Sequence, residues 1–168
     1  MEQKRTLSLL VDNTPGLLSR VAGLFSRRGY NIETITAGVT ADPRYTRMTV
    51  VLYCSDEMIL EQIKKQLAKL VDVRDIKELK PDESVRRELM LVKIRVNENE
   101  RRNVIAISDV FRGRSVDVGQ ESLIVELTGN QSKLEGFLNL VQGYEILELA
   151  RTGVTGLSRG VHDVRYLD

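Results

Sequence analysis

The stretch DNTPGLLSRVAGLFSRRGYNIETI, residues 12–35, places a turn, a proline and a glycine in front of one short amphipathic helix. The preceding run TLSLLV, residues 6–11, has the two-residue apolar period of a strand. We expect Thr14 to cap the helix and Pro15 to take its first position, because proline lacks the amide hydrogen that would stay unpaired there. Gly29 is expected to end the helix. Apolar side chains recur at helical spacing at Leu17, Leu18, Val21, Ala22, Leu24 and Phe25.

Three further strands and one further helix are predicted after this first helix. A second strand is predicted over residues 31–41 and a third over 48–54, with the turn ADPRY between them. Residues 55–70 predict a second amphipathic helix, and residues 71–79 predict a fourth strand. The order strand, helix, strand, strand, helix, strand is the split βαβ or ferredoxin-like arrangement.

The same pattern starts again after the polar stretch KPDESVRR, residues 80–87, whose charges and proline indicate a linker. Beyond it, the order of strands and helices repeats in ELMLVKIRV, NVIAISDVF, SVDV, SLIVELTG, SKLEGFLNLV and EILELART. We therefore expect an α+β protein with two ferredoxin-like βαββαβ units, at residues 1–79 and 88–168. The glycine-rich tail from residue 153 is expected to be a loop or extended arm of the second unit.

Composition argues against several classes of function. The 168 residues are 42% hydrophobic and 29% charged, and 25 basic against 24 acidic side chains leave a formal net charge of +1. This balance does not favour a nucleic-acid partner, and no apolar run suits a membrane span or a secretion signal, so we expect a cytoplasmic protein. The only cysteine, Cys54, is expected to be buried, and the only histidine, His162, lacks metal-binding neighbours. No nucleophile or phosphate-binding motif indicates an enzyme.

The turn before the first helix is the strongest candidate for ligand binding. The proline leaves the amides of Gly16 and Leu17 free at the positive end of the helix dipole, and glycine lets a carboxylate approach closely. Asn13 and Asn31 offer amide donors and acceptors, and Ile32 adds apolar surface. These residues suit a small amino acid with an aliphatic side chain. A well-capped helix with ordinary turn residues explains the same stretch equally well, so both interpretations stay open on these residues alone.

A resemblance to a known family favours the first interpretation. It is carried by five segments: NTPGLLSRVAGLFSRRGYNIETI, RMTVVLYCSDEMILEQIKKQLAKLVDV, RELMLVKIRV, FRGRSVDV and ARTGVTGLSRG. Together they resemble the regulatory small subunit of acetohydroxyacid synthase (AHAS), also called acetolactate synthase, over nearly the whole chain. The first unit resembles an ACT domain, whose signature is an asparagine and a glycine before the first helix, here Asn13 and Gly16.

The resemblance implies a non-catalytic regulatory subunit in branched-chain amino-acid biosynthesis. In that family the effector, usually valine, sits between the ACT domains of two subunits. Ligand contact is therefore carried over to Asn13, Gly16, Leu17, Asn31 and Ile32. The resemblance also implies a homodimer that activates a catalytic subunit and confers feedback inhibition by valine, leucine or isoleucine. Thiamine diphosphate, magnesium and FAD are expected in the catalytic partner, with no cofactor or metal in this chain.

The second unit is not expected to hold an effector. Its corresponding turn, NENERRN at residues 97–103, has no glycine before the helix and crowds charge where a ligand would sit. In the first unit, the third strand is apolar on both faces, so we expect dimerisation to cover the sheet face that two helices leave open. The rival interpretation is a free-standing ACT-type amino-acid sensor without an enzyme partner. An enzyme in its own right has the least support.

Overall fold

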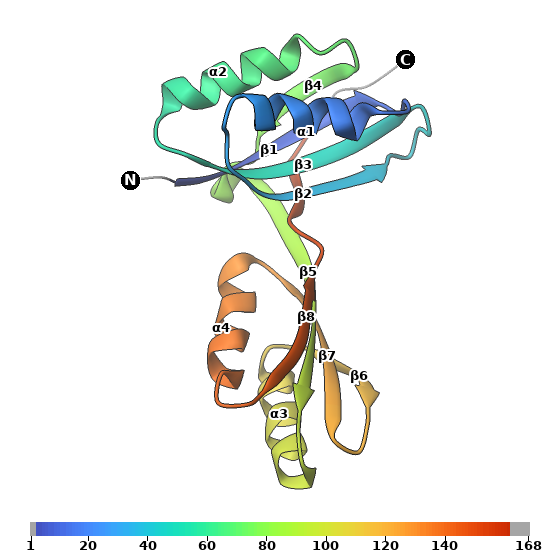
Figure 1. The fold of residues 1–168 in the computed structure, drawn as a ribbon, viewed down its shortest axis with the longest axis vertical. Helices are drawn as coiled ribbons and strands as arrows, with labels where there is room; N and C mark the ends of the chain where they lie inside the picture. The colour runs from blue at the N-terminus through green and yellow to red at the C-terminus, as the bar shows by residue number, and fades with distance from the viewer. Residues whose placement is uncertain (1–2, 162–168) are drawn as a thin grey trace. The chain divides into compact units, whose positions relative to one another are not determined.

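The computed structural model describes residues 3–161, which form two compact units (Figure 1). Of these residues, 3–86 and 154–161 belong to the first unit, and Arg87–Gly153 form the second. Each unit has the order strand, helix, strand, strand, helix, strand. The predicted α+β fold with two ferredoxin-like units is therefore confirmed.

The first unit contains a four-stranded antiparallel sheet with two helices on one face. Its elements are β1 (Gln3–Asp12), α1 (Leu17–Arg27), β2 (Ile32–Val39), β3 (Tyr45–Cys54), α2 (Glu57–Ala68) and β4 (Val73–Glu78). The strand order is β2-β3-β1-β4, and Figure 1 shows α1 and α2 over the same face. Leu7, Leu9 and Val11 alternate along β1 and are fully buried in the core with Phe25 of α1. The period of the sequence thus selects the face that the helices cover.

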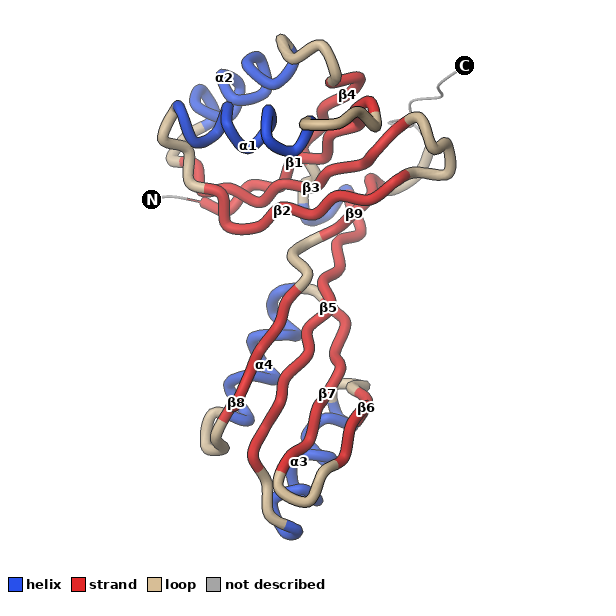
Figure 2. Tube along the Cα trace, turned by 45° about the vertical axis from the view of Figure 1, so that its right-hand side comes forward, coloured by secondary structure: helices blue, strands red, loops and turns tan. Residues whose placement is uncertain are grey.

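The other face of this sheet is contacted by a later segment of the same chain. Strand β9 (Thr155–Ser158) lies against β3 on the side opposite the two helices (Figure 2). The Thr36 hydroxyl donates to the Val154 carbonyl oxygen at 3.0 Å, and Lys77 Nζ donates to Ser158 Oγ at 3.0 Å. Side chains that alternate with the helix-facing ones are buried here too, including Ser8, Leu10, Thr49 and Val51.

The boundary between the units differs from the expected one. Residues 80–87, expected to be a linker, form the short helix η1 (Pro81–Glu83) and the start of β5 (Ser84–Arg95). The start of β5 packs on the first unit, where Ser84 is buried and Arg86 donates to Thr6 Oγ1 at 3.3 Å. Residues 154–161, expected in the second unit, lie in the first, and their strand β9 pairs with β5.

Gly156, in the tail, lies where the chain passes close to the backbone at the start of β5. A Cβ atom at Gly156 would lie 2.8 Å from the Val85 carbonyl oxygen and 3.1 Å from Leu79 Cδ1. Glycine is the residue that permits this approach. Its presence in the tail therefore reflects packing, although the composition of the segment predicts a loop.

The second unit repeats the layout with its own core. Its elements after β5 are α3 (Glu98–Val110), β6 (Arg114–Val118), β7 (Ser122–Gly129), α4 (Gln131–Val141) and β8 (Ile146–Arg151). The strand order is β6-β7-β5-β8, and all three pairings are antiparallel. Met90, Val92 and Ile94 of β5 are fully buried with Phe137 of α4. Leu91, which points to the other face, is 38% exposed, and β6 is exposed along its length.

Candidate functional site

The β1–α1 turn, residues 12–17, connects the end of β1 to the start of α1. Gly16 is the N-cap residue of α1, with a left-handed φ of 77°, and no side chain caps the helix. The prediction that Thr14 caps the helix, with proline in the first helical position, is wrong, because the helix begins at Leu17. The Thr14 hydroxyl donates instead to Asp72 Oδ1 at 3.1 Å. Glycine suits position 16 because other residues rarely adopt this backbone conformation.

Several backbone amides at the start of α1 are open. Among residues 3–161, no acceptor lies in hydrogen-bonding position to the amides of Gly16, Leu18 and Ser19. The Leu17 amide, predicted to be free, makes a long 3.4 Å bond to the Thr14 carbonyl oxygen, and the Leu17 side chain is buried in the core. The open amides lie at the positive end of the helix dipole, which stabilises an anion.

A buried carboxylate contacts this turn from another element. Asp72, in the loop between α2 and β4, is 7% exposed. Its carbonyl oxygen accepts from the Asp12 amide at 2.8 Å, and Oδ2 accepts from Arg20 Nε at 2.9 Å. The Arg20 guanidinium also donates to Thr14 Oγ1 at 3.2 Å and to the Pro15 carbonyl oxygen at 3.3 Å. Sequence patterns do not predict this cluster, because its members come from separate elements.

Both sides of the turn are tied to neighbouring segments. The Arg74 guanidinium donates to the two Asp12 carboxylate oxygens at 2.7 and 2.6 Å, and these hydrogen bonds lower the pKa of Asp12 below its ordinary value. The Asn13 amide donates to the Arg44 carbonyl oxygen at 2.8 Å, and Asn13 Nδ2 donates to the Pro43 carbonyl oxygen at 3.1 Å. Asn13 is exposed and precedes Gly16 by three residues.

The other predicted site residues lie at the opposite end of the sheet. Ile32, the first residue of β2, pairs with Leu52, which pairs with Arg5 near the start of β1. The β1–α1 turn instead follows Asp12 at the end of β1. At about 3.3 Å per residue, the strand from Arg5 to Asp12 spans roughly 20 Å. Within one chain, the structure therefore does not bring Asn31 and Ile32 to the β1–α1 turn, and α1 runs between the two ends (Figure 1).

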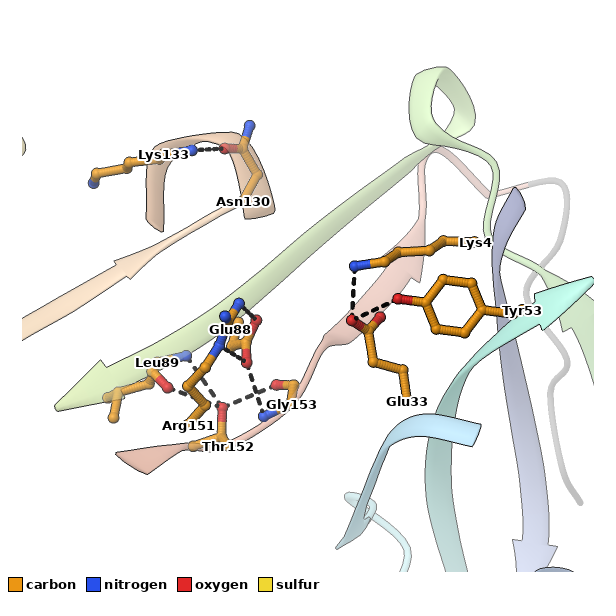
Figure 3. Close-up of polar contacts among 10 residues, drawn as sticks. All are labelled: Lys4, Glu33, Tyr53, Glu88, Leu89, Asn130, Lys133, Arg151, Thr152 and Gly153. Atoms are coloured by element: carbon orange, nitrogen blue, oxygen red, sulfur yellow. Dashed lines mark hydrogen bonds and ion pairs between the residues drawn. The ribbon is translucent and has the colours of Figure 1, made fainter. Parts of the chain in front are cut away.

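Asn31 borders a small polar group at this second end. It is exposed, and its carbonyl oxygen accepts from the Tyr53 amide at 3.1 Å. Glu33 accepts from Lys4 Nζ at 2.7 Å and from the Tyr53 hydroxyl at 3.3 Å (Figure 3). Ile32 is half-buried against the core. This end thus offers an exposed amide side chain beside apolar surface.

The corresponding turn of the second unit is closed by its own side chains. Asn97 caps α3, with its Oδ1 accepting from the Glu100 amide at 2.9 Å. Glu100 Oε2 in turn accepts from the Asn97 amide at 2.9 Å, which completes a capping box. Glu98 and Glu100 also place acidic groups in the first turn. A carboxylate ligand would meet negative charge here.

The second unit has a buried ion pair at the end of β8. Glu88 is 4% exposed, and Arg151 donates to both of its carboxylate oxygens at 2.9 Å (Figure 3). The Gly153 amide adds a bond to Glu88 Oε1 at 3.2 Å, and the Leu89 amide donates to Thr152 Oγ1 at 3.1 Å. These contacts fix the last residues of the unit to β5.

The part of the chain that the structure describes, residues 3–161, contains no group of three or more His, Cys, Asp or Glu side chains arranged to hold a metal ion. No helix in the same range is long and apolar enough to cross a membrane. Cys54 is buried, as predicted. His162 lies outside the described residues.

Both units match family descriptions. Residues 7–75 match the AHAS small subunit-like ACT domain, and residues 87–160 match the small subunit of acetolactate synthase. The second range begins at residue 87, where the structure also divides the chain.

Similar proteins share almost the full length. The chain is 49% identical over 155 residues to the probable acetolactate synthase small subunit of Methanothermobacter thermautotrophicus, covering 92% of each chain. It is 46% identical over 155 residues to the acetolactate synthase small subunit of Mycobacterium leprae, covering 92% of this chain and 91% of the relative. The crystal structure of the Thermotoga maritima small subunit superposes with a TM-score of 0.86 at 38% identity, over 95% of this chain and 99% of that one. The chain therefore belongs to the family of acetolactate synthase small subunits.

Proposed function

We propose that this chain is the regulatory subunit of an acetolactate synthase, and that it senses a branched-chain amino acid at a site shared by two first units. Valine, leucine or isoleucine would bind there, and the subunit would activate the catalytic chain and confer feedback inhibition on it. The observation that carries this proposal is the separation of the candidate residues into two ends of the first sheet.

One end suits the carboxylate of an amino acid. The amides of Gly16, Leu18 and Ser19 make no hydrogen bond within residues 3–161, and Gly16 adds no side chain of its own over the start of α1. Asn13, three residues before Gly16, is exposed, and its side-chain oxygen has no partner among residues 3–161. The Leu17 side chain belongs to the core, so we assign this residue a backbone role.

The other end suits the rest of the ligand. Asn31 is exposed and Ile32 is half-buried, which combines a polar amide with apolar surface for an aliphatic side chain. The two ends are roughly 20 Å apart along β1, far more than a single amino acid can bridge. A second copy, related by a two-fold axis, would bring its Asn31 to the turn of the first copy and create two equivalent sites.

The proposed homodimer does not depend on the apolar pattern of the third strand. The sequence suggests that a partner covers the open face of the first sheet, but residues on that face are already buried within one chain, where β9 contacts β3. The proposed dimer therefore depends on the divided site and not on an exposed apolar face.

The small-subunit family implies a catalytic partner, and we expect that partner to carry thiamine diphosphate, magnesium and FAD. The residues of this chain would contribute regulation only. A biosynthetic role of this kind places the complex in the cytoplasm.

The proposal is tested with the full chain, alone and with its catalytic subunit. Calorimetric titration with valine, leucine and isoleucine should show binding of at least one of them. Light scattering should show a dimer or a larger species that the ligand favours through mass action. The activity of the catalytic subunit should rise when this chain is added and fall when the same amino acid is added.

Three results would contradict the proposal separately. Failure of all three amino acids to bind would remove the effector site. A strictly monomeric chain at saturating ligand would remove the shared site. A catalytic subunit whose activity is the same with and without this chain would remove the regulatory role.

A further inference from the structure

We propose that Asp72 is a positioning residue of the effector site, which holds the β1–α1 turn in the conformation that receives the ligand carboxylate. This inference rests on the proposed function, because it concerns the same site. It adds a residue from outside the turn, together with the way in which that residue acts.

The contacts of Asp72 converge on the turn. Its carbonyl oxygen accepts from the Asp12 amide at 2.8 Å, its Oδ1 from the Thr14 hydroxyl at 3.1 Å and its Oδ2 from Arg20 Nε at 2.9 Å. The Asp72 side chain is 10% exposed and that of Arg20 is 45% exposed, so the carboxylate is largely shielded from water while the guanidinium is partly solvated. Hydrogen bonds to a charged group are stronger than those between neutral groups. Asp72 lies in the loop before β4, so it holds the turn from a separate element.

Asp72 also fixes the position of a cation beside the open amides. The Arg20 guanidinium lies across the turn, where it donates to Thr14 Oγ1 and to the Pro15 carbonyl oxygen. A Cβ at Gly16 would lie 3.2 Å from Arg20 Nη1, which shows how close the guanidinium is to the N-cap. A positive charge is unfavourable at a helix N-terminus, and the Asp72 carboxylate offsets this.

Loss of the carboxylate should therefore loosen the receiving turn. A neutral amide at this position keeps one acceptor oxygen, so either Thr14 or Arg20 would meet an NH₂ donor in place of an acceptor. Ligand binding would then have to order the turn, which weakens affinity. The Asp72 carboxylate repels the ligand carboxylate and attracts its ammonium group, so removing its charge has opposite electrostatic effects on the two ends of the zwitterion. The loss of order thus decides the direction of the effect.

The experiment compares four variants of the full chain. Asp72→Asn removes the charge with little change in shape, and Thr14→Val removes the hydroxyl but no charge. Thr14→Ser restores the hydroxyl. Asp75→Asn is the matched control, because the Asp75 side chain makes no hydrogen bond or ion pair with other residues in the range 3–161. Calorimetry with valine and thermal melts are run on each chain, and activity is measured with the catalytic subunit across a valine titration.

We expect Asp72→Asn to raise the valine dissociation constant about tenfold and Thr14→Val about threefold, the range for lost buried hydrogen bonds. Thr14→Ser and Asp75→Asn should stay near wild type. Activation without valine should be unchanged in all four variants, which separates positioning from a general structural role.

The outcomes distinguish this inference from the proposed function. If the wild-type chain does not bind valine, leucine or isoleucine, both fail. If it binds valine, but Asp72→Asn and Thr14→Val bind equally well or more tightly, only the role of Asp72 is overturned. A parallel loss of activation without valine would also overturn it, because Asp72 would then support the whole subunit. If Asp72→Asn does not fold, the valine dissociation constants of Thr14→Val and Thr14→Ser test whether the bond between Asp72 and Thr14 supports binding.

Discussion

The two units place a helix directly after their first strand, but these helices begin differently. In the second unit, Asn97 and Glu100 satisfy each other's backbone amides in a capping box. In the first unit, Gly16 stands at the cap position and no side chain caps α1. The same fold thus closes one helix start with its own side chains and leaves the other open to an external acceptor. The comparison teaches that the repeated architecture does not repeat the candidate site.

The sheets of the two units differ as well. The first sheet has a helix-covered face and a second face that β9 contacts, with Thr49 and Val51 buried there. In the second unit, Leu91 is partly exposed on the face away from the core, and β6 is exposed throughout. The two sheets therefore differ because the tail contacts the second face of the first sheet.

The largest effect is expected from a substitution that gives the open start of α1 a side-chain acceptor of its own. Gly16→Asp would place a carboxylate beside the open amides, where it competes with the ligand carboxylate. The half-inhibitory valine concentration should rise at least about 30-fold, since charge-assisted hydrogen bonds contribute roughly 2 kcal/mol. The fold should survive, because aspartate tolerates a left-handed φ better than most residues and the flexible end of Arg20 can shift. A valine titration of the reconstituted complex, with thermal melts in parallel, measures both effects.

Gly160→Asp is the matched control, because Gly160 has a similar φ of 74° and is exposed in the tail. It should carry similar backbone strain without a change in valine response. Wild-type sensitivity in a well-folded Gly16→Asp chain would mean that the turn only starts a helix.

The next largest effect is expected from a substitution that disturbs the packing of the tail on the first sheet. Gly156→Ala would push a methyl group against the Val85 carbonyl oxygen, so the tail should pack less well on the first unit. We expect the free energy of unfolding to fall by about 1–3 kcal/mol, as for other overpacked sites. Denaturant unfolding of the full chain measures the loss. Gly143→Ala, where a Cβ meets nothing within 4 Å, is the control; equal stability of the two variants would show that the tail packing is unimportant.

A smaller effect is expected from removing the side-chain cap at the start of α3 in the second unit. Asn97→Ala removes one half of the capping box and should lower the stability by about 1 kcal/mol. The response to valine should remain that of the wild type, because the second turn has no proposed ligand. A shifted valine titration in this variant would show that the second turn takes part in effector binding.

The smallest expected effect concerns pH. The pKa of Asp12 is lowered from 3.8 by its hydrogen bonds with Arg74. A lowered pKa means that the carboxylate contributes stability above the unfolded value, and that this contribution is lost as pH falls below 3.8 through the folded value. Asp12→Asn should reduce the loss of stability between pH 5 and acid conditions only slightly, because the pair is partly exposed and screened by salt. The free energy of unfolding of the wild-type chain is measured against pH at low and at high salt. Identical profiles at the two salt concentrations would contradict a contribution from the Asp12–Arg74 pair.

Features that arise within short segments can be predicted from the amino-acid sequence. The two-residue period of Leu7, Leu9 and Val11 and the helical spacing up to Phe25 predict the elements and their buried faces, because apolar burial selects those periods locally. The repeat after residue 87 similarly predicts a second unit. The family resemblance adds the ACT domain and identifies Asn13 and Gly16 as its signature residues.

Contacts between segments that are distant in the sequence become visible only in the folded protein. Thr14 looks like a helix cap, but its hydroxyl has a better partner in Asp72, which a local pattern cannot reveal. The glycine-rich tail looks like a loop of the second unit, but it packs on the first sheet, where Gly156 passes close to another backbone segment. Strand pairing places Asn31 at the far end of the sheet from Gly16. These outcomes depend on long-range packing and hydrogen bonds, whose free energies depend on the whole folded arrangement and not on any one segment.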